Sequence, residues 1–142
     1  MKTVKQLLDE KGHHVVSIHP DDSVLDAIQM MADKEIGALL VMENEKPVGI
    51  VTERLYARGV ILKGKSSPRT KVREIMTRSV ICARPEQTVE ECMAVMTDKR
   101  VRHLPVLEEK KIVGIVSIGD LVKSIIADQK FVIEQFEHYV HG

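Results

Sequence analysis

The stretch Gly114-Ile-Val-Ser-Ile-Gly-Asp120 decides the fold predicted for this chain. Its β-branched residues before Ser117 suit a buried strand, and the apolar run that follows Asp120 suits a helix. Ser and Asp are common at helix N-termini, because their oxygens accept hydrogen bonds from free backbone N–H groups. The same N–H groups and the positive end of the helix dipole attract phosphates. The stretch therefore predicts a strand-to-helix junction at which Ser117 and Asp120 either cap the helix or bind a polar ligand.

Much of this stretch belongs to an internal repeat. An offset of 65 residues relates Pro20–Val51 to Pro85–Val116 without a gap, and both copies end in the identical run Val-Gly-Ile-Val. A short segment ahead of each copy, called the leader below, also repeats with weaker similarity: Val4–Leu8 resembles Val72–Met76. Such self-similarity predicts two copies of one supersecondary unit. Each copy is close to the lower size limit of an independent domain, so we expect the two to share a core.

Hydrophobic periodicity predicts the same order of elements in both copies: a leader, a short strand, a helix, a two-stranded hairpin and a closing helix. For the first copy the expected ranges are Lys2–Leu8, Val15–Ile18, a helix from Val24 past Met31, Ala38–Met42, Val48–Thr52 and Leu55–Leu62. For the second they are Val72–Met76, Val80–Cys82, Thr88–Lys99, His103–Leu107, Ile112–Ser117 and a helix over Leu121–Ile126. Ser23 with Asp26, and Thr88 with Glu91, have the spacing of a capping box.

The repeat divides the chain into residues 1–62, a linker at 63–71, residues 72–127 and a C-terminal helical extension at 128–142. The linker is basic and contains Gly, Ser and Pro, so it is either a solvated connector, which the composition favours, or a loop that attracts phosphate. From Leu121 onward, apolar residues recur at roughly helical spacing. They are Leu121, Val122, Ile125, Ile126, Val132, Ile133, Phe136 and Val140. This stripe needs a covering surface, either the chain's own core or a second subunit.

Composition excludes several classes of protein. The 142 residues contain 21 basic and 21 acidic side chains, so bulk charge gives no reason to expect nucleic-acid binding. No apolar run is long enough to cross a bilayer, and the N-terminus lacks the apolar core of an export signal. Cys82 and Cys92 lie within apolar elements, as buried thiols do in a reducing compartment. We therefore expect a cytoplasmic protein.

The element order, the doubled Gly-Ile-Val strand and the run His103–Val106 resemble the cystathionine β-synthase (CBS) domain, and two such domains in tandem resemble a Bateman module. The resemblance spans roughly Val4–Ala127. It implies an α/β (α+β) fold of two β-α-β-β-α repeats related by a pseudo-twofold axis, with two clefts between them. In this family the clefts commonly bind AMP, ADP, ATP, NAD or S-adenosylmethionine, and the modules commonly pair as homodimers. In larger proteins they regulate an attached enzyme, channel or transporter. For this chain the resemblance implies a stand-alone CBS-pair regulatory protein that senses the energy or redox state in signal transduction.

The resemblance also implies which residues bind the ligand. The hydroxyl and the carboxylate that follow the Gly-Ile-Val strand hold phosphate and ribose in this family, and here they match Ser117 and Asp120, with Gly119 between them. The adenine slot is implied by the residues that line it in the family: Val80, Ile81, Cys82, Arg102, His103, Leu104 and Pro105. In the first copy Thr52 is retained, but Leu55 replaces the carboxylate. We therefore expect one tight nucleotide site, in the cleft that contains Asp120.

Further expectations concern charge and assembly. Arg54 and Arg58 are one helical turn apart, so they either face a nucleotide phosphate together or are simply solvated. We expect a homodimer that uses the helices Val24–Met31 and Val89–Met96 or the closing helices, unless these apolar faces are wholly internal. The regulated partner protein is not evident from the sequence.

Two other kinds of site were weighed against nucleotide binding. No Ser-His-Asp or Cys-His constellation is evident, so the sequence does not favour an enzyme. The histidines at 13, 14 and 19, and those at 138 and 141, have no metal-ligand spacing with cysteines, and we expect no metal. The remaining alternative is a protein-interaction module whose clefts are vestigial.

Overall fold

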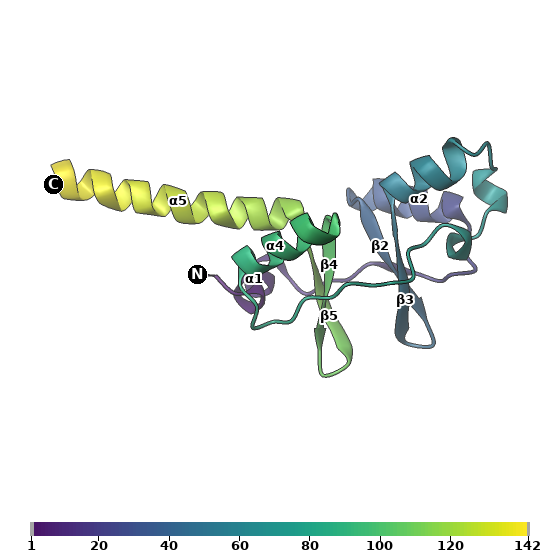
Figure 1. The fold of residues 1–142 in the computed structure, drawn as a ribbon, viewed down its shortest axis with the longest axis horizontal. Helices are drawn as coiled ribbons and strands as arrows, with labels where there is room; N and C mark the ends of the chain where they lie inside the picture. The colour runs from purple at the N-terminus through teal and green to yellow at the C-terminus, as the bar shows by residue number, and fades with distance from the viewer. Residues whose placement is uncertain (1, 142) are drawn as a thin grey trace. The chain divides into compact units, whose positions relative to one another are not determined.

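The computed structural model describes residues 2–141, and the burial of side chains within residues 2–138. Val140 and His141 of the predicted tail therefore lie outside the described side chains. The chain forms two compact units (Figure 1). The first unit is Val15–Ile81, and the second unit combines Met1–His14 with Cys82–Gly142. Both units mix helices with a small sheet, which confirms the predicted α/β fold class.

The first unit is built on a three-stranded sheet in the order β1-β2-β3, in which β1 pairs with β2 in parallel and β2 with β3 in antiparallel. Its elements are β1 (Ser17–Ile18), α2 (Val24–Lys34), β2 (Ala38–Glu43), β3 (Lys46–Thr52), α3 (Glu53–Tyr56), the π-helical η1 (Ala57–Ile61) and the short 3-10 helices η2 (Ser67–Arg69) and η3 (Val72–Glu74). Val24, Ala27 and Met31 recur at helical spacing on α2 and are buried in the core of this unit.

The second unit is built on the antiparallel hairpin β4-β5. Its elements are α1 (Val4–Lys11), α4 (Val89–Lys99), β4 (His103–Glu108), β5 (Lys111–Ser117) and α5 (Ile118–His141). Val89, Cys92 and Met96 form the buried stripe of α4. The buried stripes of α2 and α4 are therefore internal to the two units. Leu25 of α2 is 37% exposed, and the homodimer stays a prediction. No helix within residues 2–141 is long and apolar enough to cross a membrane.

Each hairpin turns through two residues that both adopt the left-handed conformation. In the first hairpin they are Asn44 and Glu45, with φ of 52° and 64°, and in the second Glu109 and Lys110, with φ of 49° and 67°. Positive φ at both central residues matches the right-handed twist of the flanking strands. The predicted hairpins are confirmed, and each carries an irregularity at the same repeat position, after Val41 and after Val106.

The leaders pack on the opposite repeat. A Cβ atom added at Gly114 of β5 would lie 2.7 Å from a methyl carbon of Leu8 in α1. A Cβ atom added at Gly49 of β3 would lie 2.8 Å from the sulfur of Met76 and 2.8 Å from the carbonyl oxygen of Thr77. The repeated glycine therefore lets a leader approach the strand closely. The compact units consequently differ from the sequence ranges of the two repeats.

The strand predicted at Val80–Cys82 is wrong, because these residues have no strand conformation and only Ala83 forms an isolated parallel bridge to Val106. The repeat offers a direct comparison. Leu40 donates its N–H to the carbonyl of Val16 at 3.3 Å and helps to seat β1 on β2. Its repeat counterpart is Pro105, which has no N–H and cannot extend the ladder beyond Ala83.

The helix starts follow the predicted capping residues in part. The hydroxyls of Ser23 and Thr88 accept hydrogen bonds from the N–H groups of Asp26 and Glu91, at 3.0 and 3.1 Å. A reciprocal capping box instead forms at Thr3, which the sequence analysis did not identify. The predicted closing helix Leu55–Leu62 is divided between α3 and the π-helical η1. The predicted tail forms one continuous helix of 24 residues.

Candidate functional site

The junction between β5 and α5 carries a reciprocal pair of hydrogen bonds. Asp120 N–H donates to Ser117 Oγ at 3.1 Å, and Ser117 N–H donates to Asp120 Oδ2 at 2.8 Å. Two N–H groups at the start of α5 are thereby satisfied, as in a capping box. The capping role that the sequence left open is therefore present.

Lys11 adds a positive charge to this junction from the last turn of α1. Its ammonium group donates to Asp120 Oδ2 at 2.6 Å and to the carbonyl oxygen of Ile115 at 2.6 Å. These two contacts use two of the three N–H donors of the lysine, and the third can bind a further acceptor. Lys11 was not predicted as a site residue, because the first helix was expected to end at Leu8 and because 109 residues separate Lys11 from Asp120.

Asp120 is held as a carboxylate with one oxygen available. Partial burial by itself raises its pKa, but the hydrogen bonds from Lys11 and from the Ser117 N–H, together with the charge of Lys11, outweigh burial and lower the pKa below the usual range. Both hydrogen bonds reach Oδ2. Within the described residues, Oδ1 accepts no hydrogen bond. The carboxylate is thus fixed in orientation through Oδ2, and Oδ1 can accept a hydrogen bond from a ligand.

The start of β4 lies beside this carboxylate. His103 is paired with Ser117 across the hairpin, and the carbonyl of Arg102 accepts a hydrogen bond from the N–H of Ile118 at 2.8 Å. Burial and the nearby charge of Lys11 lower the pKa of His103, although Asp120 opposes them. A neutral imidazole therefore lies in a half-buried position next to the junction. Leu104 and Pro105 follow in β4 and are buried.

The other residues predicted for this site are placed as follows. Gly119 is exposed on the first turn of α5, and a Cβ atom added there would meet only Ser117 Oγ at 3.6 Å. Val80, Ile81 and Cys82 are half-buried. Cys82 and Cys92 are free thiols, as predicted, and burial raises the pKa of Cys92 to about 11. Cys92 is therefore a protonated core residue at neutral pH.

The matching junction of the first unit lacks the carboxylate. Thr52 Oγ1 accepts a hydrogen bond from the N–H of Leu55 at 3.1 Å, which repeats one half of the Ser117–Asp120 pair. The side chain of Leu55 packs against the apolar core instead. Arg54 and Arg58 are exposed. The second unit thus brings together Lys11 with Arg102, His103, Ser117 and Asp120, whereas Thr52, Arg54 and Arg58 belong to the first unit.

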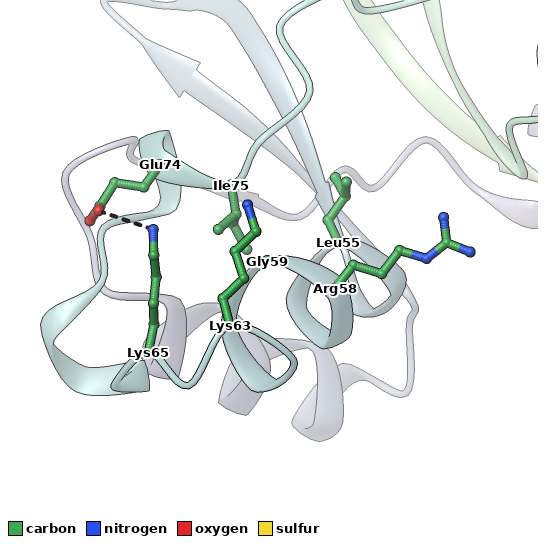
Figure 2. Close-up of a pocket in the computed structure, with 7 residues that line it drawn as sticks. All are labelled: Leu55, Arg58, Gly59, Lys63, Lys65, Glu74 and Ile75. Atoms are coloured by element: carbon green, nitrogen blue, oxygen red, sulfur yellow. Dashed lines mark ion pairs between the residues drawn. The ribbon is translucent and has the colours of Figure 1, made fainter.

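A basic pocket of about 290 Å³ lies beside η1 of the first unit (Figure 2). Its lining residues are Leu55, Arg58, Gly59, Lys63, Lys65, Glu74 and Ile75. Figure 2 shows that Arg58 points away from Lys63 and Lys65, and that Lys65 forms an ion pair with Glu74 at 3.9 Å. The cations therefore do not converge on one point of the pocket.

One cluster has the composition of a metal site. His19, Asp21 and Glu43 place one ligand atom each within 4.8 Å of one another. Arg73 already donates to the carboxylates of Asp21 at 2.8 Å and Glu43 at 3.4 Å. Its hydrogen bond and charge lower the pKa of Asp21. The guanidinium supplies the positive charge of this cluster, so the geometry describes an ion-pair network.

Comparisons with known proteins agree with this architecture. The CBS domain family profile matches residues 4–55 and 72–127. The chain is 40% identical over 127 residues to the mitochondrial CBS domain-containing protein CBSX3 of Arabidopsis thaliana, covering 86% of this chain and 62% of that protein. It is 52% identical to a putative signal-transduction protein with CBS domains from Burkholderia ambifaria, with a TM-score of 0.87 and coverage of 90% and 96%. The CBS domain structure NE2398 is 58% identical, with a TM-score of 0.85 and coverage of 88% and 98%.

A more distant match was solved with ligands. The CBS domain pair of protein MJ0100 in complex with 5′-methylthioadenosine and S-adenosyl-L-methionine is 25% identical to this chain. Its TM-score is 0.80, and the match covers 90% of this chain and 98% of the other. The present chain spans less than two thirds of the length of CBSX3, so the comparison with that relative concerns the CBS region only.

Proposed function

Because this chain belongs to the CBS-domain family and carries two copies of the domain, we propose that it is a regulatory protein that binds an adenine nucleotide at the junction of Ser117 and Asp120. The observation that carries the proposal is the orientation of Asp120. Its Oδ2 is held by Lys11 and by the Ser117 N–H, at 2.6 and 2.8 Å. The free Oδ1 is suited to accept a hydrogen bond from a ribose hydroxyl.

The electrostatics of the junction favour a phosphate next to the ribose. Lys11 is a cation with one unused N–H donor, and the start of a 24-residue helix adds the positive end of its dipole. A phosphate is therefore stabilised here more than a neutral substituent. We assign AMP, ADP, ATP or NAD as the ligand class, with the base near Arg102–Pro105 and Cys82 of the same unit.

The proposed role is to sense a nucleotide without consuming it. The adenosine ligands of the MJ0100 domain pair support an adenosine-containing ligand, and the description of the Burkholderia protein supports a role in signal transduction. Lys11 and Asp120 are paired with each other, and His103 is half-buried beside them. Helix α5 starts at this site, so a bound nucleotide would change the environment of α5. A regulated protein that contacts α5 would respond to that change.

The alternative is a protein-interaction module with vestigial clefts. It is favoured by Leu55, which leaves the first junction without a carboxylate, and by the ion pair that Asp120 already forms. Under this alternative, α5 would contact a partner protein whether or not a nucleotide is present.

Thermal denaturation with a ligand panel tests the proposal. AMP, ADP, ATP, NAD, NADH and S-adenosylmethionine are compared with adenosine and with GMP. At least one adenine nucleotide is expected to raise the melting temperature in proportion to the logarithm of its excess over the dissociation constant. Chromatography of the recovered ligand should show it unchanged. Absence of a shift with every adenine nucleotide would favour the interaction module, and conversion of the ligand would contradict the sensor.

A further inference from the structure

Helix α5 presents an apolar stripe that its own unit does not cover. The helix meets its unit through Leu121 and Ser124, which are buried in the first two turns. From residue 127 to residue 138 every side chain is exposed. Among residues 118–138 of α5, the large apolar side chains that remain exposed are Val122, Ile126, Phe131, Val132, Ile133 and Phe136, at 40 to 67%. In Figure 1, α5 extends well beyond α4 and the β4-β5 hairpin of its unit. Such exposure on a long helix indicates a contact surface.

The spacing of these residues follows a heptad. Val122, Ile126, Gln129, Ile133 and Phe136 are separated by alternating steps of four and three residues. This pattern places them along one seam of the helix. Val132 lies at the border of the seam, whereas Phe131 lies on the opposite side of the helix, about 180° from the middle of the seam at 100° per residue. On the same basis the buried Leu121 and Ser124 lie about 100° and 160° from the middle of the seam, so the helix buries a different face.

We propose that a second copy of this chain covers this seam, so that two α5 helices pack against each other as a short coiled coil. One heptad seam is complementary to the same seam on another copy, and an isologous interface needs only that one patch. Val122, Ile126, Val132, Ile133 and Phe136 are 40 to 67% exposed and are available to a second copy. Covering them on both copies would bury at most about 1,000 Å², which is the lower limit for a specific interface.

The charges beside the seam favour this occupant over a membrane surface. From residue 122 onward α5 carries the cations Lys123 and Lys130 and the anions Asp128, Glu134 and Glu137. Helices that bind at membrane surfaces are typically rich in Lys and Arg on the polar face, whereas this one has an acidic excess. Gln129 is a polar interruption of the seam, of the kind that sets register in coiled coils at a cost in stability. The inference does not depend on nucleotide binding.

Sedimentation equilibrium of the full chain tests the proposal. The parent is expected to show twice the monomer mass of 16.0 kDa at micromolar concentration. Phe136→Glu should raise the dimer dissociation constant at least tenfold. Phe131→Glu is the matched control, because Phe131 and Phe136 are 61% and 67% exposed on opposite sides of the helix. It should leave the dimer intact. Gln129→Leu should lower the dissociation constant by removing the polar interruption.

Circular dichroism on each variant confirms that the helix and the fold persist, since glutamate is a good helix former. A monomeric parent would overturn the proposal, as would a dimer that Phe136→Glu leaves unchanged. Equal dissociation by Phe131→Glu and Phe136→Glu would overturn the assignment of the seam. A monomer that sediments with vesicles of phosphatidylcholine and phosphatidylglycerol would identify a membrane surface as the occupant instead.

Discussion

At the residue scale, Asp120 uses its two oxygens differently, which makes its structural role compatible with the proposed binding role. Oδ2 closes the capping box of α5 and pairs with Lys11. Within the part of the chain that the structure describes, Oδ1 accepts no hydrogen bond and is available to the proposed ligand. The two explanations that the sequence offered for Asp120, a helix cap and a ribose clamp, are therefore compatible. Lys11 links them, because its positive charge keeps the carboxylate ionised.

Two histidines of the second unit should titrate on opposite sides of the ordinary pKa. The carbonyl of Val113 and the carboxylate of Asp9 accept hydrogen bonds from the imidazolium of His13 and raise its pKa above 6.5. Burial and Lys11 lower the pKa of His103 below 6.5. Protonated His13 therefore contributes stability that is present below pH 6.5 and is lost as the pH rises through its raised pKa. Neutral His103 contributes stability that is present above pH 6.5 and is lost as the pH falls through its lowered pKa.

Two-dimensional NMR of the imidazole resonances measures this order directly. His13 should titrate at a higher pH than His103. Lys11→Met should raise the pKa of His103, because a nearby positive charge is removed. A titration of His103 at or above that of His13 would show that the junction is more open to water than the structure indicates.

At the scale of elements, the repeated glycines determine how closely the leaders pack against the hairpin strands. Gly114→Ala should destabilise the protein by about 1–3 kcal/mol, because its Cβ atom would overlap the buried Leu8. Gly49→Ala should cost more, since one atom in its way is the backbone carbonyl of Thr77 and cannot move like a side chain. Gly119→Ala is the control and should be neutral or stabilising by up to about 1 kcal/mol. Urea denaturation orders the three variants, and equal effects would contradict the close approach of the leaders.

The sequence predicted the hairpins, α2, α4 and the position of Asp120, because these depend on local patterns. Periodicity and turn chemistry do not act across distant segments, so the contact of Lys11 with Asp120 was not predicted. The absence of a strand at Val80–Cys82 is explained by one residue of the sequence, because Pro105 cannot donate the backbone hydrogen bond that Leu40 donates in the first repeat. The position of the leaders was not predicted for a different reason. Val4–Leu8 and Val72–Met76 resemble each other, and either could pack on either hairpin.

At the scale of the whole molecule, each compact unit combines the hairpin of one repeat with the leader of the other. Leu8 and Met76 are the leader side chains that face the two glycines. The hydrophobic content of each unit therefore depends on residues that are distant in sequence. A substitution in one leader should loosen the hairpin of the other repeat.

Hydrogen exchange tests this arrangement with a matched pair of variants. Leu8→Ala leaves a cavity at a fully buried site and should cost about 2–5 kcal/mol. Exchange should then increase in β4 and β5 rather than in β2 and β3. Met76→Ala should produce the reverse pattern, because Met76 packs in the core of the first unit. Faster hydrogen exchange in β2 and β3 of the Leu8→Ala variant would contradict the packing of each leader on the hairpin of the other repeat.

Calorimetric titration of the adenine nucleotide that stabilises the parent most, against the Asp120→Asn variant, tests the central claim most directly. A hydrogen bond to a charged group is worth about 1.5–3 kcal/mol, so the dissociation constant should rise roughly ten- to a hundredfold. Asp98→Asn is the control, because Asp98 is an exposed carboxylate on α4 of the same unit, and it should bind as the parent does. Circular dichroism establishes that both variants fold. If Asp120→Asn binds the nucleotide as tightly as the parent, the carboxylate is only a helix cap and the assigned site is wrong.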